Sequence, residues 1–577
     1  MWGTCLISVF VACAAPPTED VGAAGSRTRY SPDEDPLVNP PELFEPLDGR
    51  THLSDEDGTV YRHTLDRPTS MNPTFVTTTS DQLLAELMYD GLVFQSRDVE
   101  ALPDPASVES MEFSDDRRVT SIRLRADKRW HDAKPWTAHD VRFSWQVAID
   151  PRAPSFYYRG FAEQIEDVKV IDDLNLKVVH RESTPIATEH LRFPIIPRHI
   201  WGERKERAAD PTMKSSPYFT HWGREEVVAS GPYRFVDWVP GDRVVLERWD
   251  DYAGERPNFA RVVFKIQPDR NTALLLFRKG ELDDIWLTVQ QFAKATTDEA
   301  FADIGVKAWA PRRMLGYLAW NQRGTNPFFG DVRVRRAMGH AYDRARVIET
   351  VTHNVYLPST GLFEPGHWCF NPEVSPIPYH LEEASRLLDE ADWRIDSDDG
   401  WRYKEIDGER VRFDFEMLIY QTFNDAVRMS DILRDSLRRI GVTFRSSTLE
   451  GATLVDRMRR GEFEAIAGTA TAYGDVSIWR DFLHTDMIDG GLNYWGYRNP
   501  EVDRLFDEGR RELDRDRRAE LYRQIQGLVY EDQPLLFLWN YTVTQGFARD
   551  MRGVVLSPIG VRRFRPGPRA WWRLHAQ

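Results

Sequence analysis

Hydrophobic positions from Thr59 onward alternate between the two-residue spacing of strands and the wider spacing of amphipathic helices. In the first half of the chain, the two-residue spacing predicts strands at residues 61–65, 119–124, 168–171, 176–179 and 262–266. A β-hairpin is expected over residues 233–247, because two strand-like runs flank Pro240-Gly241. In the second half, strands are predicted at residues 413–418, 442–444 and 535–539.

Helical spacing predicts a first helix that Ser80 or Asp81 caps and that ends at Gly91, and a second helix that opens at Thr137 and Asp140. The second half is richer in helices, which are expected after Asp331 and at residues 381–391, 424–440, 500–513 and 517–530. Strands and helices that alternate in this way indicate lobes of the α/β class.

The first 58 residues do not share this pattern. Residues 6–12 are an uncharged apolar run, far shorter than the roughly 20 residues that span a bilayer. Ala12 followed by Cys13 resembles the cleavage site of a bacterial lipoprotein signal, although Phe10 stands where Leu is usual; the alternative is a frayed apolar N-terminus. Residues 14–58 hold eleven acidic residues and three arginines, and we interpret them as a flexible acidic tether.

Composition limits the classes of function. A chain of 577 residues with 41% hydrophobic residues can form two large lobes, and its formal charge of −16 argues against nucleic acid as the main partner. The cysteines, Cys5, Cys13 and Cys369, exclude a disulfide framework and a cysteine-based structural zinc site.

Catalytic signatures are not found in the sequence. It lacks a GxSxG elbow, an HExxH pair, a phosphate-binding loop and a GxGxxG fingerprint. The histidines are scattered without the spacing of metal ligands, for example His131, His139, His180, His190 and His199. We therefore expect a binding protein, with no catalytic residue, metal or cofactor.

Eight segments, in order along the chain, resemble the bacterial extracellular solute-binding proteins of family 5, the peptide/nickel type that serves ABC transporters. The resemblance runs from about Val60 to Phe547. The segments are SMNP (70–73) with YDGLV (89–93), FSDD (113–116) with IRLR (122–125), KRWHD (128–132), PWTAHDV (135–141), PIIPRHIW (194–201), GPYRF (231–235), DVRVRRA (331–337) and GYRNPEVD (496–503).

The resemblance implies a type II periplasmic-binding-protein-like α/β fold, with two lobes, a hinge and a discontinuous first lobe. It places lobe I at residues 59–312 and 542–577, and lobe II at residues 313–541. Such a protein closes over a solute in its cleft and delivers it to an ABC permease in the membrane. With residues 1–13 as a lipoprotein-type signal, we expect a monomer in the periplasm or at the cell surface, anchored by lipid at Cys13.

In peptide-binding members of the family, a cleft segment carries an Asp that pairs with the α-ammonium group of the ligand, since a buried ammonium group needs a carboxylate. The matching stretch is 469–476, with Thr469 in place of a Trp and Ala472 in place of that Asp, whereas Tyr473 and Asp475 are kept. Either Asp475 takes the role or the ligand is not a simple peptide; the alternative role for Asp475 is a helix cap.

The resemblance also brings the loop after Pro73 and several aromatic side chains to the ligand. The further candidates for ligand binding are Thr77, Thr78, Thr79, Tyr157, Tyr158, Trp320, Asn321, Trp368 and Trp479. Each has an ordinary alternative, which is helix entry for the threonines and core packing for the aromatic residues.

These features predict the substrate-binding subunit of an ABC importer, with a peptide or peptide-like solute as ligand. Two alternatives stay open at this point. One is a binding protein for an oligosaccharide or another neutral solute, because the Asp is missing at position 472. The other is a secreted enzyme or sensor on the same scaffold.

Overall fold

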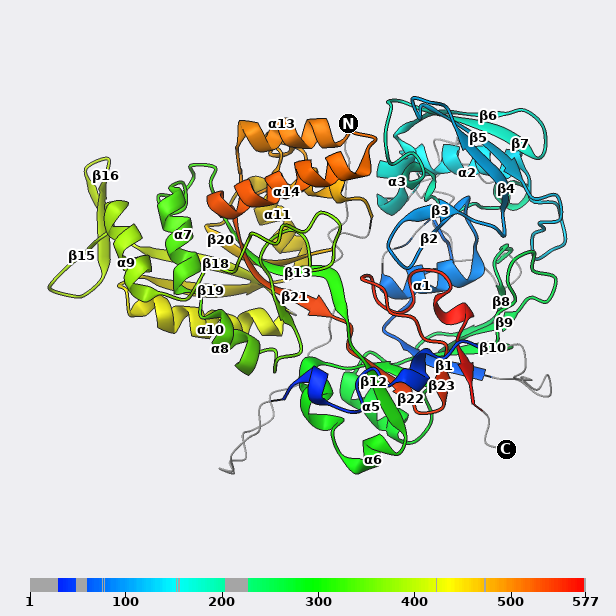
Figure 1. Cartoon of the computed structure of the whole chain (residues 1–577), viewed down its shortest axis with the longest axis horizontal. Coiled ribbons are helices and arrows are strands. Elements are labelled where there is room, and N and C mark those ends of the chain that lie inside the picture. Colours follow the sequence, from blue (N-terminus) through cyan, green and yellow to red (C-terminus); the bar gives the residue numbers. More distant parts are fainter. Residues whose placement is uncertain are drawn as a thin grey trace.

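This computed structural model describes residues 30–47, 60–74, 76, 78–151, 153, 156–202, 227–421, 423–471 and 474–574, and only the backbone of Phe156 and Tyr157. The predicted signal and the lipid attachment at Cys13 lie outside the described residues, as do Thr77 and Tyr473. The chain forms two α/β lobes joined by long strands (Figure 1), which confirms the predicted fold class.

The described part of the first lobe is built on several small sheets. One has the order β1-β10-β9-β8, with only the β1–β10 pair parallel. Another is antiparallel with the order β4-β5-β7-β6. The strands are β1 (Val60–Leu65), β8 (Tyr233–Val239), β9 (Arg243–Arg248), β10 (Arg261–Ile266), β4 (Val108–Phe113), β5 (Val119–Leu124), β6 (Ile165–Val170) and β7 (Asn175–His180), with the short pair β2 (Val93–Gln95) and β3 (Ala101–Pro103).

A third sheet of this lobe joins distant parts of the chain in the order β11-β22-β12. Its strands are β11 (Asp284–Trp286), β12 (Gly305–Ala308) and β22 (Gln545–Ala548), and a further pair is formed by β23 (Met551–Arg552) and β24 (Trp572–Arg573). Because β22 pairs with both β11 and β12, the C-terminal tail is part of the first lobe, which is therefore discontinuous in sequence.

Helices cover these sheets. They are α1 (Thr79–Met88), α2 (Ala138–Ile149), α3 (Phe156–Ala162), α5 (Arg270–Arg278) and α6 (Glu299–Ala302), with the short turns η3 (Glu189–Leu191), η5 (Gln291–Ala295) and η8 (Gly567–Arg569). The predicted cap of α1 is wrong. Thr78 is the cap: its Oγ1 accepts from the Asp81 N–H at 3.0 Å, and the Asp81 carboxylate accepts from the Thr78 N–H at 3.0 Å. An acidic side chain in the first turn can reach back to the cap, which places it inside the helix instead of before it.

Residues 30–47 differ from the expected flexible tether, because they pack against the first lobe. They include the short turns η1 (Pro32–Glu34) and η2 (Pro41–Phe44), and the side chain of Leu43 is fully buried. Asp35 pairs with the buried Lys307 ammonium group at 2.5 Å. Asn39 donates to the Trp309 carbonyl at 2.7 Å and accepts from the Trp309 N–H at 2.9 Å. Apolar residues dispersed among the acidic ones supply this packing.

The second lobe is centred on a six-stranded mixed sheet with the order β14-β21-β13-β20-β18-β19. Its long strands β13 and β21 lead from the first lobe into this sheet and are antiparallel to each other. The strands are β13 (Pro311–Trp320), β14 (Leu357–Pro358), β18 (Asp414–Tyr420), β19 (Thr443–Leu449), β20 (Ala465–Thr471) and β21 (Leu535–Thr542). A separate small sheet at the far end of the lobe holds β15 (Arg394–Ile395), β16 (Arg402–Ile406) and β17 (Glu409–Arg412).

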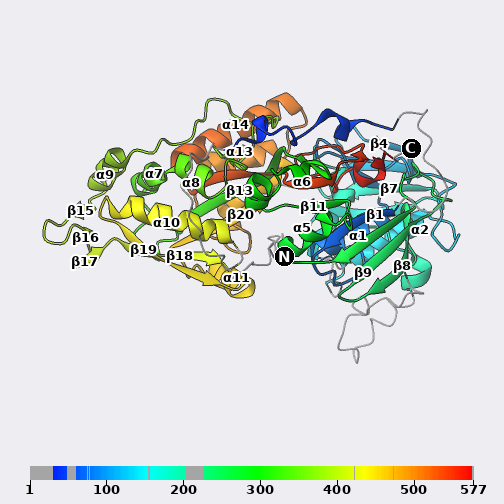
Figure 2. The same cartoon turned by 90° about the horizontal axis from the view of Figure 1, so that it is seen from below.

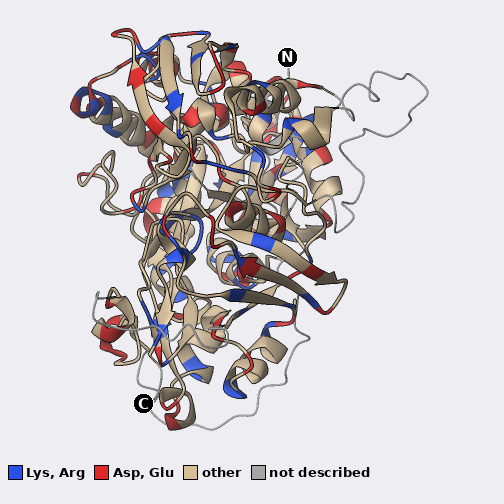
Figure 3. Cartoon of the chain, turned by 90° about the vertical axis from the view of Figure 1, so that its right-hand side faces the viewer, with Lys and Arg blue, Asp and Glu red and all other residues tan. Residues whose placement is uncertain are grey.

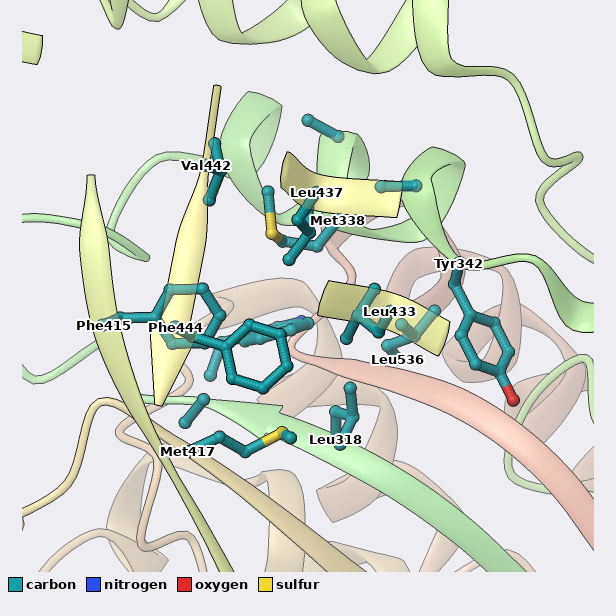
Figure 4. Close-up of a cluster of buried hydrophobic side chains, with 14 of the residues drawn as sticks. Leu318, Met338, Tyr342, Phe415, Met417, Leu433, Leu437, Val442, Phe444 and Leu536 are labelled. Atoms are coloured by element: carbon teal, nitrogen blue, oxygen red, sulfur yellow. The ribbon is translucent and has the colours of Figure 1, made fainter. Parts of the chain in front are cut away.

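Helices lie on both faces of the six-stranded sheet (Figure 2), because successive residues of its strands point to opposite faces. Leu318 and Trp320 of β13 pack with α7, α9 and α10, whereas Tyr317 and Ala319 pack with α11 to α14. Figure 4 shows part of the first of these cores. The helices are α7 (Val332–Ala341), α8 (Arg344–Thr350), α9 (Leu381–Glu390), α10 (Asn424–Arg438), α11 (Gly451–Arg460), α12 (Trp479–Leu483), α13 (Pro500–Gly509) and α14 (Arg515–Asp532), with the turns η6 (Val476–Ile478) and η7 (Thr485–Met487).

Acidic and basic residues are mixed over the elements in the view of Figure 3. Among the described helices, none combines the length and apolar character that crossing a bilayer requires.

Candidate functional site

The two lobes touch each other beside the crossing strands. Arg515 at the start of α14 forms an ion pair with Glu100 of the first lobe at 2.9 Å. The Arg313 guanidinium group donates to the Asp98 carbonyl at 3.4 Å. Gly474 of the second lobe packs closely against Arg192 of the first lobe. A Cβ atom added to Gly474 would lie only 3.3 Å from Arg192 Nη1. The structure is therefore in a closed arrangement.

A pocket lies at this junction, on the side of the second lobe. It combines the start of β13, the loop before Cys369, the end of β20 with the loop that follows it, and one residue of β21. Its lining residues are Arg312, Arg313, Met314, Leu315, Leu362, Phe363, Glu364, His367, Ala470, Gly474, Val476, Trp479 and Asn540.

Two charges of the pocket neutralise each other. Arg313 Nε donates to Glu364 at 3.1 Å, and each side chain is only 9% exposed. Burial raises the pKa of the Glu364 carboxyl group, and the Arg313 charge opposes that effect. Burial lowers the pKa of His367 to about 3, so its ring is neutral at pH 7 and accepts from the Cys369 N–H at 3.0 Å.

Asp475 is engaged within the second lobe beside the pocket. Its carboxylate accepts from both terminal nitrogens of Arg518, one of them at 2.6 Å, and from the Ser477 N–H at 2.9 Å. It is thereby the N-cap of η6, which agrees with the alternative role that the sequence left open. Because Arg518 already neutralises it, Asp475 has little charge to offer an incoming ammonium group.

Aromatic side chains from the candidate set border the same region. Trp479 is nearly buried and lines the pocket. Trp368 lies under two cations, with the guanidinium carbon of Arg515 at 5.3 Å and that of Arg518 at 5.8 Å from its ring centroid. Arg518, which the sequence did not single out, therefore connects the two predicted residues Trp368 and Asp475.

The other predicted residues do not line this pocket. Thr78 caps α1 and Thr79 is its first residue. Tyr158 and Trp320 are buried in hydrophobic cores. Asn321 is also buried, and its amide donates to the Gly461 carbonyl at 3.0 Å. Thr469 lies in β20 opposite Gly316. The side chain of Tyr157 is outside the described residues, as are Thr77 and Tyr473. For all of these, ligand contact stays a prediction.

The sequence did not identify most of the pocket. The missed residues with polar or charged side chains are Arg312, Arg313, Glu364, His367 and Asn540. One signal was present, because two adjacent arginines stand at the start of the otherwise apolar strand β13. Within the described residues, no group of His, Cys, Asp and Glu is arranged to hold a metal ion.

Comparison with known proteins agrees with this architecture. The chain is 24% identical over 539 residues to oligopeptide-binding protein AppA of Bacillus subtilis (strain 168), covering 90% of this chain and 92% of that protein. It is 26% identical over 482 residues to heme-binding protein A of Haemophilus influenzae, covering 80% and 83%. The solved structure of Bacillus subtilis AppA with a nonapeptide matches with a TM-score of 0.72 at 22% identity, covering 89% of this chain and 99% of that one.

The family model described as bacterial extracellular solute-binding proteins, family 5 Middle, matches residues 103–481. That match covers most of both lobes and includes the crossing strand β13 and the loop that carries Asp475. The chain belongs to the family 5 bacterial extracellular solute-binding proteins.

Proposed function

We propose that this protein is the substrate-binding subunit of an ABC importer, which captures a peptide or peptide-like solute between its lobes and passes it to a membrane permease. The observation that supports this most directly is the pocket at the lobe junction, which is lined from the crossing strand β13 and includes Gly474, the residue that packs against Arg192 of the first lobe. A solute held there would favour the closed state by its contacts with both lobes. The relatives named for oligopeptides point to the class of ligand.

This proposal includes the residue limits of the two lobes that would move relative to each other. We place lobe I at residues 59–312 and 542–577 and lobe II at residues 313–541, because the chain enters the six-stranded sheet between β12 and β13 and leaves it between β21 and β22. The protein would act as a monomer without catalysis and without a cofactor.

Native mass spectrometry of the protein purified from its own source tests the ligand class. We expect a series of bound masses that fragment as short peptides. A bound mass that fragments as a sugar, with no binding from a peptide digest, would reject the peptide assignment and leave an oligosaccharide-binding protein.

Membrane attachment is a separate proposal that rests on Cys13. We expect Cys13→Ala to move the protein from the membrane fraction to the soluble fraction, because one lipid-modified cysteine would supply the anchor. Cys5→Ala is the matched control and should leave the distribution unchanged. Retention of the Cys13→Ala variant on membranes would contradict the anchor.

A further inference from the structure

Three residues that line the pocket carry buried N–H groups without an acceptor among the described residues. They are Arg312 with Nε, Trp479 with Nε1 and Asn540 with Nδ2. Buried donors are normally satisfied, and leaving one without a partner costs free energy. All three groups are donors, so the matching ligand group is one that accepts hydrogen bonds.

The net charge of the pocket also favours a ligand group that accepts hydrogen bonds, and in particular an anion. Arg313 and Glu364 cancel each other, and His367 is neutral at pH 7. The guanidinium group of Arg312 has no ion pair with a carboxylate among the described residues. A pocket at a closed junction with one uncompensated cation attracts an anion strongly, because the surrounding medium screens the charge weakly.

The backbone supports the exposure of Arg312 to the pocket. The pairing of β13 with β21 shifts register between Pro311 and Leu315, so Arg312 lies in an irregular stretch of the ladder. Irregular pairing of this kind redirects side chains and often occurs beside functional sites. The arginine is therefore set at the point where the crossing strand enters the second lobe.

Among the described residues, the nearby carboxylates Asp475 and Asp425 do not form an ion pair with Arg312. Asp475 is held by Arg518, as described above. Asp425 and Arg312 both influence the ionisation of Tyr356 and Tyr541. Burial raises the pKa of Asp425 to about 6, and Arg428 is the cation that acts on it.

We propose that this pocket is an anion subsite, in which Arg312, with Trp479 and Asn540, binds a carboxylate group of the solute. The inference rests on the proposed function and extends it, since it makes an acidic group, in place of a free amine, the recognised feature of the ligand. A planar guanidinium group suits a carboxylate because it can donate two parallel hydrogen bonds.

The test uses the full chain and pools of short N-acetylated peptides, compared by native mass spectrometry at one salt concentration. One pool lacks Asp and Glu and has free C-terminal carboxylates, a second is its C-terminal amide form, and a third is amidated but contains Glu. We expect the first or third pool to be bound about tenfold or more above the second, because charge-assisted hydrogen bonds exceed neutral ones.

Arg312→Gln should abolish this preference, and Arg312→Lys should retain part of it. Arg346→Gln, on the exposed surface of α8, is the matched control and should bind as the parent protein does, and thermal unfolding checks that each variant is folded. Equal binding of the three pools by the parent protein, or a preference that survives in Arg312→Gln, would overturn the anion subsite alone. Binding of the same peptides only when their N-termini are free would also overturn the anion subsite alone, whereas binding of neither the acetylated nor the free peptides would reject the proposed function, and this inference with it.

Discussion

Asp475 and Arg518 illustrate how one residue pair limits what the cleft can recognise. Their side chains are only 14% and 7% exposed. Burial alone would raise the pKa of Asp475, but the charge of Arg518 and hydrogen bonds to the carboxylate outweigh it and lower that pKa. A lowered native pKa stabilises the fold above the ordinary pKa of an aspartate, and this contribution is lost as the pH falls through the native value.

Asp475→Asn should reduce the free energy of unfolding by about 3 kcal/mol at pH 7, because it leaves Arg518 nearly buried without an anion. The difference from the parent protein should shrink as the pH falls from about 4, where the carboxyl group of the unfolded chain takes up a proton, through the lower native pKa of Asp475. Urea unfolding at pH 7 and at pH 3 measures both effects.

Asp435→Asn is the control for that measurement, because Asp435 and Arg346 form an exposed pair at 3.4 Å. Its cost should be below about 0.5 kcal/mol. Similar losses for both variants would show that the Asp475 pair is no stronger than a surface pair.

At the scale of elements, a buried histidine pair joins β7 to η3 next to the lobe junction. His180 Nδ1 lies 3.0 Å from His190 Nδ1, and His180 Nε2 lies 2.8 Å from Thr120 Oγ1. One histidine must donate and the other accept, so the pair requires at least one neutral ring. Burial lowers the pKa of His180 to about 4 and that of His190 to about 3.

Stability should therefore depend on pH through this pair. The unfolded chain binds protons near pH 6.5 and the native pair does not, so the contribution is complete above pH 6.5 and declines towards pH 4. His190→Gln should be less stable at pH 7 but should lose about 2 kcal/mol less between pH 6.5 and pH 4.5. Thermal unfolding across this range is the measurement, and the exposed His139→Gln should keep the parent slope. A parent-like slope for His190→Gln would contradict the assignment.

Particular elements show what can be read from the sequence. Helices such as α10 and strands such as β5 follow from spacing, because their apolar residues repeat with the period of the structure they form. Arg312 could not be placed in this way. Its position depends on a register shift in β13 and on the approach of residues 362–367, which are distant in sequence.

The residues of the candidate site could likewise be predicted from the sequence only in part. The resemblance led to the loop with Asp475 and Trp479, which does border the pocket. The resemblance also led to Trp320 and Asn321. The face of the sheet that a strand side chain occupies is set by the pairing register, and this register turns Trp320 into the core, where it lies beside Phe329 and Phe415. The packing of residues 30–47 was missed because Pro-rich acidic composition obscures the few apolar contacts that hold them.

At the scale of the whole molecule, polar contacts between the lobes contrast with the large apolar core inside lobe II. Arg515 and Glu100 are 62% and 45% exposed, and the pair between Arg510 and Glu182 is longer, at 3.8 Å. Exposed pairs contribute little. Closure should therefore be governed by the solute, through its different affinity for the open and closed states.

Glu100→Arg should weaken binding of the preferred peptide pool by about two- to fivefold at low salt, because it sets two cations against each other across the cleft. The charge exchange Glu100→Arg with Arg515→Glu should restore the affinity, and high salt should remove the effect of the single change. Titration calorimetry measures these affinities. A loss that neither the exchange nor salt reverses would mean that the contact does not act through closure.

The packed segment at residues 30–47 has a mechanical consequence. Tension on the chain before Tyr30 would pass through the Asp35–Lys307 pair and the Asn39–Trp309 bonds into lobe I. The Tyr30 carbonyl also accepts from the Asn354 amide of lobe II at 3.0 Å, so a pull on the N-terminus would load the region where the two lobes join and not one lobe alone. Figure 1 places this segment near β12 and α5, away from the α3 and α14 side where the lobes meet, so the force would enter the molecule at the end opposite to that contact.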